Sequence, residues 1–402
     1  LPWGLYQNDD AVLNWKLNQD LKFKSKLLKG SRTYYNKVWT NRFETLEISD
    51  SILPNFESNL NIPKDLTTIF PLEAYRTTAL TKKEHHLSIV GGIGSGKTVV
   101  LLKEWKTILD NTNWNNPIPI YVDLAAYNYT SNFEDFIITS IAINYLRKKR
   151  PSDDDINLIW NILKNPIKTE PFTPTILLML DGISEIVIDN ITLIGELKTI
   201  VTEALGTQII LTSSTDFIFT WMKQFSTIKA TELKKEQIEA YLESLDIPMP
   251  PASNKQLRQF ITTPLTLTLY GTSSNLVENY KEDKRLNFRK DVNTYSELAW
   301  NSTEAIIAKV SKELEAKEFN YVKFMIRHFL PFIGNYMEKK DKYILTESEI
   351  AEAILQASNY LFHKKFLQVF PEFIFSFRNF RLNADDWLEE LERLDFQIQF
   401  MS

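Results

Sequence analysis

The chain has 402 residues, a formal net charge of −5 and an apolar content of 44%, which is enough for the cores of roughly two to four domains. A negative overall charge argues against general nucleic-acid binding and against binding to an anionic membrane, so we expect neither partner, although the net charge leaves a local basic patch open. Because the chain has no cysteine, disulfides, thiolate metal sites and cysteine nucleophiles are excluded, and a reducing cytoplasm is the expected compartment. No apolar run approaches the ~20 residues of a membrane span, and the histidines lack metal-ligand spacing.

Residues 1–75 combine charged helical stretches with a segment that contains proline and asparagine, which predicts a helical connector and an irregular lead-in. The first residue is Leu1 rather than methionine, so we expect a processed product or an excerpt of a longer protein. A basic run at 147–150 ends a helical stretch before Pro151. We interpret it as cations at the negative end of a helix dipole and assign it no partner.

Short apolar runs begin after about residue 83 and alternate with helical patterns. They cover residues 87–90, 118–122, 176–180 and 208–212. Alternating strands and helices predict an α/β fold with a parallel sheet. After about residue 216 we expect the strands to stop and amphipathic helices to take over as a lid.

The glycine-dense stretch from Gly91 to Gly96 is the most specific local pattern. It holds four of the chain's eleven glycines, and Lys97 and Thr98 complete it into GxxxxGK[ST]. Glycines let successive backbone N–H groups face one anion, and the helix that follows adds its positive end. Lys97 is expected to reach the β and γ phosphates of a nucleotide, and Thr98 to offer its hydroxyl to Mg²⁺. The alternative is a glycine-rich turn that binds nothing.

Asp181 follows the apolar run 176–180, so it is expected at the carboxyl end of a buried strand, where an open α/β sheet binds ligands. We expect Asp181 to join the Mg²⁺ shell and Glu185 to orient or polarise the attacking water. The alternative makes both of them turn and helix-cap residues. At 213–215, short hydroxyl side chains end another strand, and a γ-phosphate sensor and a simple turn explain them equally well.

The segment from Leu178 to Glu185 resembles the extended Walker B motif of NACHT-type STAND NTPases, in which apolar residues precede D-G-x-D-E. The strand between the two Walker motifs, the sensor strand and the segment around Pro264 are similar to the same family. The resemblance implies a P-loop NTPase parallel sheet followed by a helical lid domain and a winged-helix domain. The implied domains are a helical connector at 1–75, the P-loop domain at 76–216, the lid at 217–285 and an incomplete winged-helix domain at 286–402.

The same resemblance implies a site for ATP or ADP with Mg²⁺, in which Pro264 closes over the adenine and ribose. The expected catalytic residues are Lys97, Asp181 and Glu185, and the expected metal ligands are Thr98 and Asp181. The residues expected to bind the nucleotide are Gly92, Ile93, Gly94, Ser95, Gly96, Lys97, Thr98, Val99 and Pro264.

The implied function is a nucleotide switch, in which ADP holds the domains closed and exchange for ATP opens them for homo-oligomerisation. The switch would follow an unknown protein ligand, sensed by a domain outside this chain, and would activate a flanking effector in immune or anti-phage signalling. Two alternatives stay open. One is an AAA+-like remodelling ATPase with steady turnover, and the other is a scaffold with a structural nucleotide.

Two departures from the family pattern indicate slow hydrolysis. The second acidic residue of the Walker B motif is Ser184 here, and the arginine that usually ends the sensor strand is Ser214. Losing a carboxylate and a guanidinium slows phosphoryl transfer, while phosphate binding by the loop is retained, so we expect a slow ATPase. His363 is not assigned the family's ADP-locking role, because the family's histidine follows the wing.

Overall fold

The chain divides into two compact units, and the sheet and the site candidates lie in the first. The first unit comprises Leu1–Asn279 and Arg289–Ser302, and the second comprises Tyr280–Phe288 and Thr303–Ser402. The computed structural model describes residues 9–40, 52–58, 71–80, 86–111, 117–127, 132–164, 174–185, 190–214, 224–280, 286–289, 292, 294–310, 330–340, 345, 348–350, 352–353 and 356.

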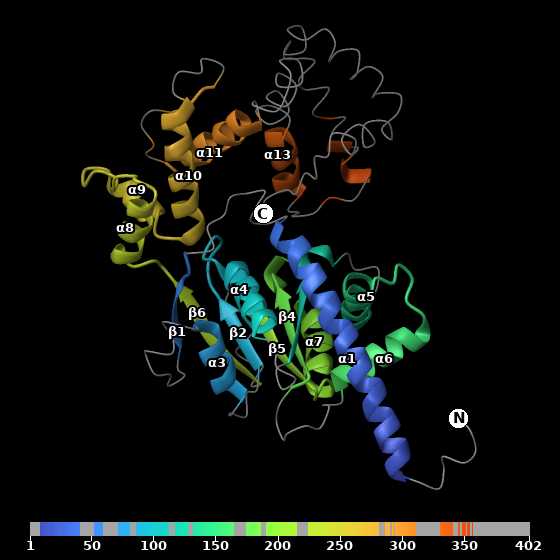
Figure 1. The fold of residues 1–402 in the computed structure, drawn as a ribbon. Helices are drawn as coiled ribbons and strands as arrows, with labels where there is room; N and C mark the ends of the chain where they lie inside the picture. The colour runs from blue at the N-terminus through green and yellow to red at the C-terminus, as the bar shows by residue number, and fades with distance from the viewer. Residues whose placement is uncertain are drawn as a thin grey trace. The chain divides into compact units, whose positions relative to one another are not determined.

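A six-stranded sheet in the order β1-β6-β2-β5-β4-β3 forms the centre of the first unit (Figure 1). Strands β2 to β6 are parallel, and β1 runs antiparallel beside β6. The strands are β1 (Asn55–Ser58), β2 (His86–Val90), β3 (Ile118–Asp123), β4 (Ile176–Asp181), β5 (Thr207–Ser213) and β6 (Phe225–Thr231). The predicted α/β fold with a parallel sheet is confirmed. Strand β5 lies between β2, which precedes the glycine-rich loop, and β4, which carries Asp181.

The expectation that strands stop at about residue 216 is wrong, because β6 lies beyond that point and pairs with β2. Its sequence, FSTIKAT, is not a continuous apolar run. Ile228 and Ala230 are buried, while Thr227 and Lys229 are exposed. One face of β6 therefore meets solvent, and its residues alternate as in any half-buried strand.

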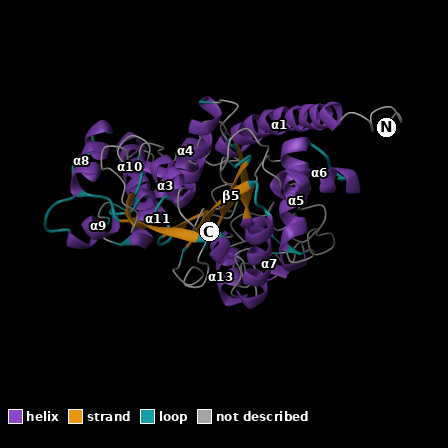
Figure 2. Ribbon diagram, turned by 90° about the horizontal axis from the view of Figure 1, so that it is seen from below, coloured by secondary structure: helices purple, strands orange, loops and turns teal. Residues whose placement is uncertain are grey.

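Helices pack on both sides of the sheet, with α1 and α4 on one side and α7 on the other (Figure 2). Those of the sheet region are α1 (Asp9–Trp39), α3 (Pro71–Leu80), α4 (Lys97–Asp110), α5 (Phe133–Leu146), α6 (Asp153–Lys164) and α7 (Asn190–Glu203). The helices after β6 are α8 (Lys235–Ser244), α9 (Lys255–Phe260), α10 (Pro264–Tyr280), α11 (Tyr295–Val310) and α13 (Leu330–Lys340). Helical structure after the sheet agrees with the predicted helical lid.

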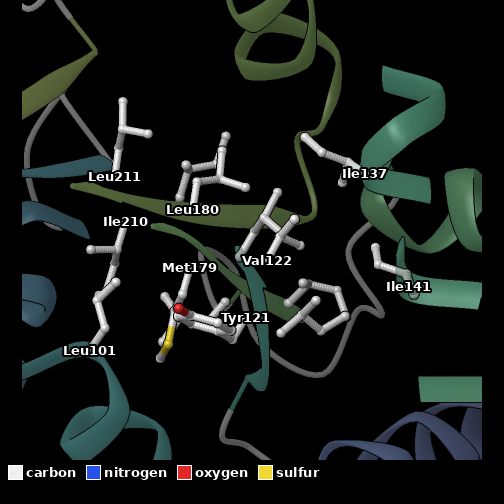
Figure 3. Close-up of a cluster of buried hydrophobic side chains, with 14 of the residues drawn as sticks. Leu101, Tyr121, Val122, Ile137, Ile141, Met179, Leu180, Ile210 and Leu211 are labelled. Carbon is white, nitrogen blue, oxygen red and sulfur yellow. The ribbon is translucent and has the colours of Figure 1, made fainter. Parts of the chain in front are cut away.

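Alternate residues of β3, β4 and β5 build the core of the sheet (Figure 3). On the side of Leu101 from α4 lie Tyr121, Met179 and Ile210, and on the opposite side lie Val122, Leu180 and Leu211. Each of these side chains is no more than 2% exposed. Burial of both faces explains why these strands appear in the sequence as continuous apolar runs.

Helix α1, in the segment predicted as a connector, packs closely on the sheet region. A Cβ at Gly30 would lie 1.9 Å from the backbone oxygen of Tyr145 on α5, so only glycine permits this approach. The Ser31 hydroxyl donates to the carbonyl of Pro119 at 2.6 Å and accepts from the indole N–H of Trp105 at 2.8 Å. The carboxyl half of α1 is therefore held by α4, α5 and β3.

Several expectations fall on residues outside the described parts of the chain. They include His363 and most of the predicted winged-helix domain at 286–402. The predicted domain boundaries stay predictions. Among the described residues, no helix is long and apolar enough to cross a membrane.

Candidate functional site

The glycine-rich loop connects β2 directly to α4, as the sequence predicts. Gly94 and Gly96 have φ angles of 74° and 87°, a backbone region that side chains with a Cβ rarely adopt. The Ser95 N–H donates to the carbonyl of Gly92 at 3.2 Å, which closes the turn. Helix α4 begins at Lys97, so its positive end faces the loop. This is the backbone arrangement that binds phosphate in proteins.

The side chain of Lys97 lies across this loop. Its ammonium donates to the carbonyl of Gly91 at 2.7 Å and to the carbonyl of Gly92 at 3.0 Å. It also lies 3.4 Å from the hydroxyl of Ser95. A phosphate bound by the loop would meet a cation already at the mouth of the turn, which is the role predicted for Lys97.

Asp181, at the end of β4, accepts hydrogen bonds from three hydroxyl groups. Thr98 Oγ1 and Tyr121 OH donate to Oδ2 at 2.7 Å and 2.8 Å, and Thr212 Oγ1 donates to Oδ1 at 2.6 Å. Asp181 is only 5% exposed. A buried carboxylate needs such donors, and these fix its orientation toward the first turn of α4.

The oxygen atoms of Thr98 and Asp181 suit Mg²⁺ by their chemistry. Hydroxyl and carboxylate oxygens are hard ligands, and neighbouring ligands of an octahedral Mg²⁺ stand about 2.9 Å apart. The two atoms are 2.7 Å apart here, so a shared ion requires little movement. Among the described residues, no group of three or more His, Cys, Asp and Glu side chains could hold a metal ion.

Two members of the Asp181 cluster, Tyr121 and Thr212, have no motif in the sequence. Thr212 comes next to Asp181 because β5 lies between β2 and β4, and its Oγ1 also accepts from the Gly182 N–H at 2.7 Å. Tyr121 reaches Asp181 from β3, two residues before Asp123, which is paired with Asp181 in the sheet. Strand order and register create both contacts. For Thr212, its position one residue before the predicted sensor segment is the sequence feature that could have pointed to the site.

The two serines that depart from the family pattern are bonded to each other. The Ser184 hydroxyl accepts from the Ser214 N–H at 2.9 Å, which joins the end of β5 to the short 3₁₀ helix Ile183–Glu185. Glu185 ends that short helix, and its side chain lies outside the described parts of the chain, as does Thr215. Neutral side chains thus occupy both positions where the family has charged ones.

Pro264, the predicted lid residue, begins α10 and lies against the glycine-rich loop. A Cβ added to Gly96 would stand 3.2 Å from Pro264 Cγ. Next to it, the Leu265 N–H donates to the carbonyl of Gly94 at 3.1 Å. The loop and the first turn of α10 are therefore in direct contact. Ile93 points outward, with 77% of its surface exposed.

The parallel sheet, the loop ahead of α4 and the acidic residue at the end of β4 are those of a P-loop NTPase. No protein-family model matches the sequence, and no curated protein matches it significantly. Similar solved structures include AMPPCP-bound DnaA from Aquifex aeolicus, with 14% identity, 79% of this chain and 94% of that chain covered and a TM-score of 0.30. Drosophila ORC bound to DNA shares 12% identity over 79% of this chain and 77% of that one, with a TM-score of 0.35.

A third similar structure is the replication initiator DnaA bound to AMPPCP and single-stranded DNA, with 13% identity, 73% of this chain and 94% of that chain covered and a TM-score of 0.32. All three are AAA+ ATPases, the class of the first alternative above, and none is a STAND protein. Identities of this size concern the fold only. Two of the three hold a nucleotide analogue.

The expectation that the chain does not bind nucleic acid in general is wrong as an exclusion, because two of these similar structures are complexes with DNA. The expectation depended on the net charge of −5. Net charge sums over the whole surface, so it does not report a local basic face.

Tyr121→Phe tests the hydroxyl cluster around Asp181. The variant removes one donor from Oδ2 and leaves the ring stacked on Trp105, whose centroid is 5.5 Å away. Loss of a residue that orients a metal ligand typically weakens metal binding 10- to 100-fold, so we expect the Mg²⁺ concentration for half-maximal nucleotide binding to rise by about tenfold. Tyr127→Phe, at a buried tyrosine outside the cluster, is the matched control. An unchanged Mg²⁺ dependence in a folded Tyr121→Phe protein would show that Asp181 does not need this donor.

Proposed function

We propose that the chain binds ATP and ADP with Mg²⁺ and converts the state of the bound phosphates into a change of its helical lid. One observation carries the proposal. The Leu265 N–H donates to the carbonyl of Gly94 inside the glycine-rich loop. Any rotation of the Gly94 peptide on phosphate binding must therefore strain or break the bond to α10.

The expected size of this coupling is modest but sufficient for a switch. One hydrogen bond contributes about 0.5–1.5 kcal/mol net, and the packing of Pro264 on Gly96 adds to it. Allosteric coupling energies in proteins are typically about 1–3 kcal/mol. A coupling of this size changes the equilibrium between the two lid positions by roughly 5- to 150-fold.

Hydrogen exchange tests the coupling directly. We expect ADP and a non-hydrolysable ATP analogue to protect the loop equally and to give different exchange rates in the first turns of α10, including the Leu265 amide. Lys97→Ala, which lacks the phosphate-binding cation, should lose both effects. Protection of the loop with no difference in α10 between the two nucleotides would contradict the coupling and favour a scaffold with a structural nucleotide.

Two classes of ATPase would use such a coupling between the nucleotide and the lid. An AAA+-like remodelling ATPase hydrolyses steadily and needs an arginine from a neighbouring subunit, whereas a STAND switch holds its nucleotide and oligomerises after ligand sensing. The switch would act in the cytoplasm and turn on a flanking effector in immune or anti-phage signalling. The bond between Ser184 and Ser214 favours the switch, because neutral groups stand where charged groups would stabilise the transition state.

The rate of ATP hydrolysis distinguishes the STAND switch from the remodelling ATPase. A purified full-length protein that keeps ADP bound and hydrolyses ATP far below about 1 per second, the lower end of typical enzyme turnover, supports the switch. Steady turnover at or above that rate, increasing with protein concentration as subunits associate, supports the remodelling ATPase.

A further inference from the structure

The described carboxyl half of α1 carries a strongly basic exposed face. Between Leu21 and Trp39 the helix has no acidic residue, and its basic residues are Lys22, Lys24, Lys26, Lys29, Arg32 and Lys37. All of them except Lys24 are exposed. The five exposed ones recur at intervals of three to five residues, which places them along one side of a helix. We name Lys22, Lys26, Lys29, Arg32 and Lys37 the α1 ridge.

The other side of α1 fixes the α1 ridge in place. Phe23 and Leu27 are buried in the core of the sheet region, and Gly30 lies against the backbone of Tyr145. In both ribbon views α1 lies along the outside of the sheet region (Figures 1 and 2). The α1 ridge is thus a straight row of cations on a rigid support, about 22 Å long at 1.5 Å per residue.

The four lysines of the α1 ridge are not balanced by acids in the described part of the chain. Among the residues that the structure describes, no carboxylate forms an ion pair with Lys22, Lys26, Lys29 or Lys37. Arg32 donates a hydrogen bond to the carbonyl of Leu109 at 3.3 Å.

The basic run 147–150 follows α5, the helix whose Tyr145 lies against Gly30 of α1. Tyr145, which Gly30 touches, is only two residues before the exposed Arg147. Within that run Lys148 is paired with Asp155 at 2.7 Å, and the exposed Asp153 and Asp154 follow. The acidic residues that follow therefore offset part of the charge of this run.

We propose that the α1 ridge binds the phosphate backbone of duplex nucleic acid. A linear polyanion matches a straight row of cations, and a duplex offers one negative charge per ~1.7 Å of its axis. This surface is separate from the nucleotide site, so the proposal does not depend on the proposed function. It also gives a physical reason why the net charge misled the expectation about nucleic acid.

Other anionic partners fit the α1 ridge less well. A helix that enters a membrane surface needs apolar residues beside its cations, and Phe23 and Leu27 are turned into the core. Single strands are held mainly by stacking on aromatic side chains, but Tyr34 and Tyr35 pack against Trp105. Protein interfaces concentrate their energy in aromatic and apolar anchors, which the exposed positions of this helix half lack.

Fluorescence anisotropy with a labelled duplex of about 20 base pairs tests the proposal on the full chain. The ridge variant is Lys22→Glu/Lys26→Glu/Lys29→Glu. The control variant is Lys198→Glu/Lys229→Glu/Lys255→Glu, three exposed lysines on α7, β6 and α9 with the same change of net charge. Thermal unfolding and nucleotide content, measured on each protein, confirm that both variants fold and keep the loop intact.

We expect the wild-type protein to bind the duplex without sequence preference, and its affinity to fall with salt at a log–log slope of about −4, as for four to five phosphate contacts. The ridge variant should lose at least thirtyfold in affinity at low salt, and its slope should flatten by about 3. The control should lose no more than about threefold. Equal losses in both variants, no duplex binding even at low salt, or binding to anionic vesicles in place of the duplex would each overturn the proposal.

Discussion

Lys97→Ala is expected to remove most nucleotide binding while the sheet stays folded. The ammonium already lies at the mouth of the loop, on the carbonyls of Gly91 and Gly92, and a triphosphate would take it over. Each charge-assisted hydrogen bond contributes about 1.5–3 kcal/mol, so loss of contacts to two phosphates costs about 3 kcal/mol or more. That is a loss in affinity of about a hundredfold.

The measurement is the dissociation constant of a fluorescent ATP analogue, together with the nucleotide released from the purified protein on denaturation. Lys103→Ala is the matched control, since Lys103 lies on the same helix and is partly exposed. If the Lys97→Ala protein retained wild-type affinity and nucleotide content, the loop would be a structural turn, and the proposed function would fail with it.

The loop could be predicted from the sequence because its chemistry is local. Glycine spacing fixes the backbone over six residues, and Lys97 and Thr98 follow at once, so no knowledge of the sheet is required. Asp181 was also predictable, because a buried parallel strand ends where the ligand edge of the sheet lies. Its contact with Thr98 at 2.7 Å joins two predictions that were made separately.

Tyr121 and Thr212 could not be predicted, because their role depends on which strands are neighbours. β5 comes after β4 in the chain but lies between β2 and β4 in the sheet, and only that order brings Thr212 to Asp181. Strand β6 was also missed, because the residues on its solvent-exposed face interrupt the run of apolar residues that would have marked it. The α1 ridge was missed as well, since a net charge reports the sum and not the arrangement of the charges.

The largest stability effect is expected from Arg76→Leu, which breaks a buried ion pair between α3 and α4. Arg76 Nε lies 2.8 Å from Glu104 Oε1, and the two side chains are 8% and 5% exposed. Burial raises the pKa of Glu104, and the Arg76 charge opposes that shift. Without Arg76 the carboxylate would be buried and uncompensated, which typically costs 3–5 kcal/mol. Chemical denaturation should show this loss at neutral pH.

The double variant Arg76→Leu/Glu104→Leu is the decisive companion, because it removes the charge together with its partner. Replacing a buried pair by apolar residues is often neutral or stabilising, so the double variant should recover most of the loss. A double variant as unstable as the single one would show that the arginine acts through packing rather than through its charge.

The pH dependence of Arg76→Leu has a definite sign. With the pKa of Glu104 higher in the folded protein than in the unfolded chain, the folded state binds more protons between the two values, and stability falls as pH rises through that window. The loss in unfolding free energy caused by Arg76→Leu should therefore be largest above the pKa of Glu104 in the folded protein. It should become smaller as the pH falls toward 4.5, the ordinary pKa of a glutamate. The double variant lacks the titrating group and should show no such trend. Because Glu104 lies two turns after Lys97 on α4, a loss of stability in Arg76→Leu without a loss of nucleotide affinity would separate the support of this helix from its phosphate chemistry.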